Sequence, residues 1–256
     1  MSTLRFGRET YNMNTLPSTQ DAARSLAEHH GSSVAGAIYS TPHQTAGRGR
    51  QGRTWFAPPG ANVVMTLIGD SVALAELWQV SFVAALAAAD AIVSAAPGVP
   101  VHLRFPNDVL LSGKKVCGIL VETATGPGVP PGTAMPLIGV GINVRGGTDA
   151  LPPEVAVRAT TIQAETGSEI AVAHVGGLLA EAFTTRWNEW REVDGFSSTL
   201  AAWHAYHDTN ARRTFVLDGT SVLCRVIGVS PDGDATIELP DRTRRTIPVA
   251  HVLFGG

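Results

Sequence analysis

Three arginines alternate with glycines in the segment GRGRQGRTW, residues 47–55. The planar fork of an arginine binds phosphate or carboxylate through two parallel hydrogen bonds, and glycine lets the backbone approach a ligand closely. The segment therefore predicts a loop that wraps anionic groups. A solvated basic loop with no ligand is the alternative interpretation.

The same segment contains the pattern G-x-G-x-x-G, with Asp70 near the spacing of a dinucleotide fingerprint. Such a turn must open into a helix whose N-terminus faces the pyrophosphate. Here RTWFAPPGAN follows, with two prolines and no helical period. The sequence therefore disfavours a dinucleotide site.

A second segment, LRFPNDVLLSGKKVCGILVET (103–123), reads as a strand, a Pro-Asn-Asp corner and a returning strand. In such a corner Asp108 can ligate Mg²⁺ and the Asn107 amide can bind a nucleotide, although both are also ordinary turn residues. The chain has 19 basic residues, and only Lys114 and Lys115 are lysines. Because a compact ammonium differs from the arginine fork, this pair is a candidate for chemistry; a chance surface pair is the alternative.

Glycine also interrupts an apolar strand in GVGINV, residues 139–144. Glycine inside a strand often marks close approach by a ligand or another backbone. Taken alone, this signal is weak.

The elements that must position these segments alternate between strand and helix. A helix is expected from the N-cap Ser18 to Gly31, and another is expected over 72–96. A Gly/Arg-rich loop is expected over 41–60 and a Gly/Pro-rich loop over 124–136. Buried strands are expected at 34–40, 62–68, 101–105, 109–111, 116–122 and 137–144.

Further helices are expected over 172–192 and 196–207. From Arg212 onward the segments TFVL, SVLCRVIGV, DATIEL and TIPVAHVLF are separated by Asp-Gly turns, which is typical of a small all-β module. A domain boundary is therefore expected near residue 210.

Composition indicates a globular protein, because 44% of the 256 residues are hydrophobic and 16% are charged. The longest apolar tract, Val80–Ala96, is alanine-rich and interrupted by Asp90, so it is expected to be a buried helix rather than a membrane span. A net charge of −3 argues against general nucleic-acid binding. Cys117 and Cys224 are expected to be reduced buried thiols.

The segments HQTAGRGRQGRTW, FPNDVLLSGKKVCGILVE and GVGINV, in this order and spacing, resemble the motifs of biotin protein ligases, QxAGRGRxGRxW, KWPNDV, KxxGILxE and GxGxNV. The resemblance extends from about Pro17 to Val144. The β-rich tail resembles the small SH3-like domain that ends these enzymes. Lipoate ligases share the fold, but the triple-arginine loop belongs to the biotin branch.

The resemblance implies an α+β fold of the class II synthetase type, with a mixed β-sheet flanked by helices in residues 1–209 and a small SH3-like β-barrel in residues 210–256. It implies a ligase that uses ATP and Mg²⁺ to form biotinyl-5′-AMP and then transfers biotin to a lysine of a biotin carboxyl carrier domain of acetyl-CoA or another acyl-CoA carboxylase. The segment MSTLRFGRET lacks the apolar stretch of a secretory signal, so a cytoplasmic protein that binds no membrane is expected; a homodimer is left open.

The same resemblance assigns roles to individual residues. Those expected to bind biotin are Ser18, Thr19, Gln20, Gln44, Arg48, Gly49, Arg50, Lys115 and Gly118. The nucleotide is expected beside Arg53, Trp55, Asn107 and Asn143. The expected catalytic residues are Lys115, Arg50 and Asp108, with Asp108 also as the ligand of the metal.

The chain departs from the motifs at Arg104-Phe105, where Lys-Trp is usual. The charge is kept but its geometry and hydration change, so turnover or affinity could differ. Two rival functions stay open: a biotin-binding regulator without ligation, and a lipoate or other acyl ligase. No DNA binding is expected, because the polar cluster at Ser18 leaves no room before it for the helix-turn-helix segment, about 60 residues long, of bifunctional members.

Overall fold

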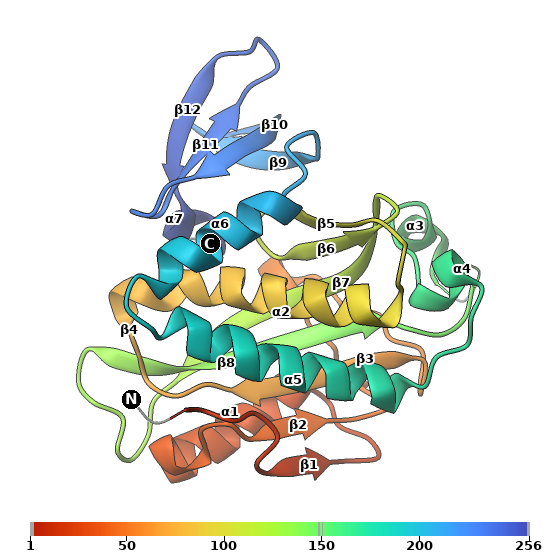
Figure 1. Cartoon of the computed structure of the whole chain (residues 1–256), viewed down its shortest axis with the longest axis vertical. Coiled ribbons are helices and arrows are strands. Elements are labelled where there is room, and N and C mark those ends of the chain that lie inside the picture. Colours follow the sequence, from red (N-terminus) through yellow and green to blue (C-terminus); the bar gives the residue numbers. More distant parts are fainter. Residues whose placement is uncertain (1–2, 148, 150, 255–256) are drawn as a thin grey trace.

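The larger of two β-sheets forms the centre of the molecule (Figure 1). The computed structural model of the chain describes residues 3–147, 149 and 151–254. The strand order is β1-β2-β3-β8-β7-β6-β5, with β4 paired to β8. The strands are β1 (Thr10–Asn12), β2 (Ile38–Ser40), β3 (Asn62–Ile68), β4 (Val72–Ala73), β5 (Val101–Arg104), β6 (Asp108–Leu111), β7 (Lys114–Ala124) and β8 (Thr133–Asn143). Only β1 and β2 pair in parallel, so the sheet is mixed, as predicted.

Helices cover both faces of this sheet (Figure 1). Helix α1 (Thr19–His30) packs on one face, where Leu137 of β8 joins its buried alanines. Helices α2 (Val80–Ala95) and α5 (Val172–Trp190) pack on the other face, where Ile138 points. Helix α6 (Gly195–Tyr206) packs against α2 and α5. Neighbouring residues of one strand thus enter two different cores, as the pleat requires.

Helix α2 is the core helix that the apolar tract predicts. Together with η3 (Leu74–Gln79) it is long and apolar enough to cross a membrane, but 78% of that window is buried inside the protein. Its alanines allow the sheet and the neighbouring helix α5 to approach it closely.

Several expected elements differ at their ends. The strand predicted over 34–40 is a turn of 3₁₀ helix, η1 (Gly31–Val34), followed by the short β2, because the positive φ of Gly36 breaks the extended run. Strands β7 and β8 extend further than predicted and leave a shorter loop. The helix expected from residue 72 starts only after β4, with η3. Helices α3 (Pro153–Ala156) and α4 (Ile162–Thr166), and strand β1, were not predicted.

The second sheet is antiparallel, with the order β12-β11-β10-β9. Its strands are β9 (Arg212–Leu217), β10 (Thr220–Val229), β11 (Asp234–Glu238) and β12 (Arg244–Pro248). Asp218 and Gly219 both have positive φ, as the predicted hairpin turn between β9 and β10 requires. The prediction of β structure for the end of TIPVAHVLF is wrong: after Pro248 the chain forms helix α7 (Val249–Phe254), whose first residue is buried.

Side chains from the C-cap of α6 and from β9 hold the second sheet against the first. The two ring nitrogens of His207 lie 3.2 Å from the Leu103 carbonyl and 2.9 Å from the Val226 carbonyl. Phe215 stacks on Phe105 with ring centroids 6.4 Å apart. The segment after β5 is therefore fixed from both sheets. Both cysteines are buried and unbonded, as predicted.

The packing of α2 predicts a sharp positional effect. Ala88 is fully buried, whereas Ser94 of the same helix is exposed. Ala88→Leu should lower the free energy of unfolding by about 1–3 kcal/mol because the core has no room for three more carbons, and Ser94→Leu should change it by less than about 0.5 kcal/mol. Urea denaturation measures both; equal effects of the two variants would contradict the packing described.

Candidate active site

A β-bulge between β6 and β7 places Lys115 on the face of the sheet that α1 covers. The pairing runs from Val109 with Cys117 directly to Leu110 with Lys115, so one residue of β7 is left out of the ladder. In an unbroken ladder Lys115 would share a face with Cys117 and point into the core. The bulge turns it to the face of Asp108 and Gly118, which pair with each other.

The sheet presents its backbone without side chains at this position, because three glycines form its surface. Gly118 pairs with Gly141, and Gly139 lies two residues before Gly141 on β8, so all three occupy the same face. We call these three residues the glycine floor. A Cβ atom added at Gly141 would lie 2.3 Å from the Trp55 ring, and one added at Gly118 would lie 2.8 Å from it. Only glycine permits this close approach.

Trp55 covers the glycine floor at Gly118 and Gly141, while Gln20 lies against Gly139. It brings the Gly/Arg loop onto the sheet, and Lys115 Nζ lies 5.7 Å from the centre of its ring. Its indole nitrogen is buried and has no hydrogen-bond partner among the described residues. A buried donor without an acceptor is costly. A ligand that displaces the ring from this position would remove that cost.

Polar side chains at the start of α1 border the floor at Gly139. Gln44 Oε1 accepts a hydrogen bond of 2.9 Å from the Thr19 backbone N–H, and Thr66 donates one of 2.9 Å to the Thr19 hydroxyl. Gln20 Nε2 donates to the Leu120 carbonyl at 3.2 Å, while Gln20 Oε1 is buried without a partner among the described residues. Gln20 therefore presents an unused acceptor beside the floor.

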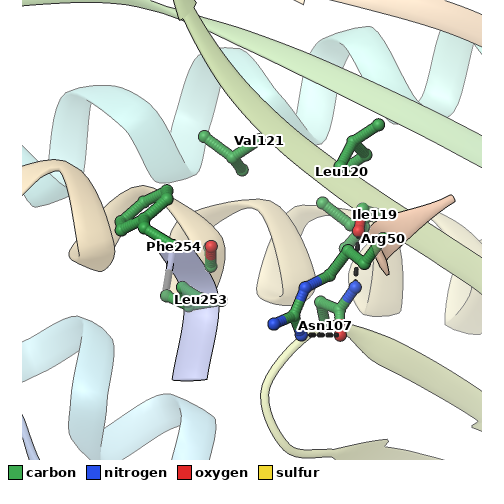
Figure 2. Close-up of a pocket in the computed structure, with 8 residues that line it drawn as sticks. Arg50, Asn107, Ile119, Leu120, Val121, Leu253 and Phe254 are labelled. Atoms are coloured by element: carbon green, nitrogen blue, oxygen red, sulfur yellow. Dashed lines mark hydrogen bonds between the residues drawn. The ribbon is translucent and has the colours of Figure 1, made fainter. Parts of the chain in front are cut away.

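Arg50 lies on the other side of the site, beside the Pro-Asn-Asp corner. Its Nη1 donates to Asn107 Oδ1 at 3.2 Å, and Asn107 Nδ2 donates to the Ile119 carbonyl at 2.6 Å (Figure 2). Arg50 also donates to the Val252 carbonyl of α7. Burial lowers the pKa of Arg50, and Arg53 adds to this effect, but Asp108 opposes it. The second sheet's terminal helix thus touches the loop at the site.

Asp108 joins two cations at the centre of the site. Its Oδ1 lies 2.5 Å from Lys115 Nζ, and its Oδ2 lies 2.7 Å from Arg104 Nη2. Burial alone would raise the pKa of Asp108, but Lys115 and Arg104 outweigh it, so the pKa lies below its ordinary value. Asp108 is therefore ionised, and it holds Lys115 beside the floor. Arg104, where the motif has lysine, keeps a charge in this cluster.

Asn143 ends β8 at the far side of the floor. Asn62 donates to Asn143 Oδ1 at 3.1 Å, and Asn143 Nδ2 donates to the Thr160 carbonyl at 3.0 Å. The Asn143 amide is buried, and these two bonds fix its orientation. Asn143 shares a face with the glycines, because it lies two residues after Gly141 on β8.

Other predicted site residues make their contacts within the loop or with α1. Arg48 forms a bidentate ion pair with Asp21 of α1, at 2.6 and 2.7 Å, and lies 3.8 Å from Glu122. Arg53 is exposed, and Gly49 only closes the loop through a 2.6 Å bond to the Arg53 carbonyl. Ser18 occupies the N-cap position of α1 but makes no capping bond with its side chain.

The predicted ligation of a metal by Asp108 competes with the ion pairs that this carboxylate already forms. Both carboxylate oxygens already contact cations, and the described residues contain no group of three or more His, Cys, Asp or Glu that could hold a metal ion. A magnesium ion here would depend mainly on nucleotide phosphates and water, as is common for Mg²⁺. Its ligation by Asp108 stays a prediction.

Sequence reasoning missed three contributors to the site. Glu122 lies 3.0 Å from Arg24 and 3.8 Å from Arg48, Arg213 of β9 donates to the Phe105 carbonyl at 3.2 Å, and Val252 of α7 receives Arg50. The alternation along β7 could have indicated Glu122, since it lies on the face of Gly118. Nothing in the sequence indicates that the second sheet reaches the corner.

Asp108→Asn tests the charge cluster. Both cations lose their shared carboxylate, so the free energy of unfolding at pH 7 should fall by about 2 kcal/mol. Because folding lowers the pKa of Asp108, its contribution is complete above the ordinary pKa of about 3.9 and is lost as the pH falls through the folded value. Urea titrations should show a constant difference at neutral and mildly acidic pH that shrinks below about pH 4. No difference at pH 7 would contradict the ion pairs.

Known proteins are similar to this chain in sequence. A family model described as the biotin/lipoate A/B protein ligase family matches residues 15–143. The biotin–[acetyl-CoA-carboxylase] ligase of Paracoccus denitrificans is 37% identical over 219 residues, which are 83% of this chain and 88% of that protein. The bifunctional ligase/repressor of Bacillus subtilis is 31% identical over 248 residues, which are 93% of this chain and 74% of that protein.

Solved structures show the same fold. The biotin protein ligase of Aquifex aeolicus in complex with biotin and ATP gives a TM-score of 0.73 at 24% identity, covering 94% of this chain and 96% of that one. The biotin protein ligase of Leishmania major with biotinyl-5-AMP gives 0.64 at 19% identity, covering 94% and 98%. This likeness confirms the predicted α+β fold. Together with the matched motifs and the sequence identities, it shows that the chain belongs to the biotin/lipoate A/B protein ligase family.

Proposed function

We propose that this chain is an ATP-dependent biotin protein ligase, which forms biotinyl-5′-AMP and transfers the biotin to a lysine of a biotin carboxyl carrier domain. The observation that carries the proposal is the convergence of the Gly/Arg loop and Lys115 on one glycine floor, through the Trp55 ring and the Arg50–Asn107 bond. These two segments lie far apart in the sequence, and the proposed chemistry needs both.

Biotin fits the end of the floor beside α1. Its fused rings carry ureido N–H groups, and Gln20 Oε1 is a buried acceptor without a partner among the described residues. A donor on the ligand would remove the cost of that orphaned acceptor. Lipoate has no N–H donor, so this acceptor favours biotin over the lipoate alternative.

Activation of the carboxylate is an attack of its oxygen on the α-phosphorus of ATP. The bond from that phosphorus to the bridging oxygen of the β-phosphate breaks, and pyrophosphate leaves. Negative charge grows on the α-phosphate, so cations fixed beside it lower the barrier. Lys115, held by Asp108, and Arg50, held by Asn107, are the groups placed to do this. Mg²⁺ accompanies ATP as part of the substrate and neutralises phosphate charge.

Transfer needs the mixed anhydride, biotinyl-5′-AMP, to be kept from water until the carrier arrives. The carrier amine attacks the acyl carbon, the bond to the AMP oxygen breaks, and the nitrogen loses a proton. In this structure the floor is covered by Trp55, and the cavity between Arg50 and α7 encloses only about 20 Å³, which is room for about one water. Substrate binding therefore requires the Gly/Arg loop to open and reclose as a lid.

The name of one relative supports the proposed partner. The Paracoccus denitrificans protein is named for acetyl-CoA carboxylase, so the carrier of an acyl-CoA carboxylase is the proposed partner. We also propose that residues 210–256 form an SH3-like unit, and that the enzyme acts in the cytoplasm. A binding-only regulator would not need Lys115 and Asp108 paired beside the floor, and for this reason we favour ligation.

Lys115→Ala and its neighbour Lys114→Ala form a matched pair that tests the proposal. Lys114 is exposed, whereas Lys115 lies beside the floor. Lys115→Ala should reduce biotin-dependent exchange of pyrophosphate with ATP by at least tenfold, which is about 1.4 kcal/mol of transition-state stabilisation, and Lys114→Ala should leave it unchanged. When the unmodified enzyme is incubated with a carrier domain, mass spectrometry should show that the carrier has gained one biotin.

Two results would count against the proposal in different ways. Biotin-dependent exchange that survives in Lys115→Ala would remove the role of this lysine. The unmodified enzyme could instead show no exchange and no carrier mass increase with biotin, but show both with lipoate. The proposed substrate would then be wrong, while the proposed activation of a carboxylate by ATP would stand.

A further inference from the structure

Arg213 brings a charge from the second sheet to the Pro-Asn-Asp corner. It lies near the start of β9, outside the segment that the family model matches. Its Nη1 donates to the Phe105 carbonyl at 3.2 Å, two residues before Asn107. Its guanidinium also lies 6.0 Å from the ring of Phe215, which stacks on Phe105. Arg213 is therefore held against the backbone that leads into Asn107 and Asp108.

The neighbours of Arg213 are mostly of like charge. Burial, together with the charges of Arg50, Arg104 and Arg53, lowers the pKa of Arg213 to about 10, and the charge of Asp108 opposes this shift. At pH 7 Arg213 is still cationic. A half-buried arginine among three others is unfavourable in the absence of an anion, since like charges in a partly desolvated site repel one another.

The single carboxylate of the cluster is already engaged. Asp108 contacts Arg104 and Lys115, and among the ion pairs of the described part of the chain none involves Arg50, Arg53 or Arg213. Four cations, Arg104, Lys115, Arg50 and Arg213, therefore interact with one carboxylate. The guanidinium of Arg213 offers five donor hydrogens, of which the described residues accept one, at Phe105. This surplus of charge and donors matches a polyphosphate, whose oxygens accept paired hydrogen bonds from arginine forks.

We propose that Arg213 binds the polyphosphate of ATP and, through the Phe105 carbonyl, positions the Asn107–Asp108 corner that faces it. The inference rests on the proposed function for the identity of the nucleotide. It assigns to the second sheet a part in ATP binding, in addition to its contact with α6 and β5. Biotin, which lies toward Gln20 and Gly139 at the other end of the floor, does not involve Arg213.

The matched variants are Arg213→Met, Arg213→Lys and Arg212→Met. Arg212 is the exposed neighbour on the same strand, so it controls for loss of a surface charge. In pyrophosphate exchange, Arg213→Met should raise the KM for ATP by at least tenfold and leave the Kd for biotin within twofold. Arg213→Lys should give an intermediate KM, because it keeps the charge but loses the fork. Arg212→Met should behave as the unmodified enzyme.

A second measurement does not depend on catalysis. Inorganic tripolyphosphate should raise the melting temperature of the full chain, and Arg213→Met should abolish that rise, while biotin should still stabilise the variant. If Arg213→Met does not fold, the Arg213→Lys values decide the question. An unchanged KM for ATP together with an unchanged tripolyphosphate shift in the Arg213 variants would overturn the inference. If the unmodified enzyme lacks exchange but shows the Arg213-dependent tripolyphosphate shift, the proposed function fails and the phosphate site stands.

Discussion

The β-bulge between β6 and β7 determines which face of the sheet Lys115 occupies. The side-chain period of a strand is two, so the omission of one residue from the ladder moves every later side chain to the other face. Here the omission falls between Lys115 and Cys117. It leaves Cys117 in the core beneath α2 and turns Lys115 toward Asp108 and Gly118. Without this irregularity the ammonium would have to be buried in an apolar core, where no anion could compensate it.

The remaining features of the site depend on that orientation. A ligand beside the Lys115 ammonium can lie against the backbone of the sheet only where no side chain intervenes. Glycine at 118, 139 and 141 leaves out those side chains. Their absence also lets the Trp55 ring lie directly against Gly118 and Gly141. Arg50 rests between Asn107 and the Val252 carbonyl of α7. Under the proposed function, the loop has to leave this surface before a substrate can reach it, so its opening is coupled to substrate binding.

Much of this could be predicted because it is local. Helix α1 begins at its cap and ends at a glycine, β3 has the predicted bounds, and Lys115, Asn107, Asp108 and Trp55 lie together as their motifs indicate. The bulge could not be predicted, since it is a property of two paired strands. The role of α7 was also missed, because VAHVLF has strong β propensity and becomes helical only where Val249 is buried under the second sheet. Arg213 has no local signal at all; tertiary packing alone brings it to Phe105.

A crystal structure of the protein with biotinyl-5′-AMP tests this arrangement most directly. The account predicts that the fused rings lie on Gly139 and Gly141 with Gln20 at hydrogen-bond distance, that Lys115 approaches the phosphate, and that Trp55 has left its position over Gly118. An adenylate bound elsewhere, with the Trp55 ring still on the glycine floor, would contradict it.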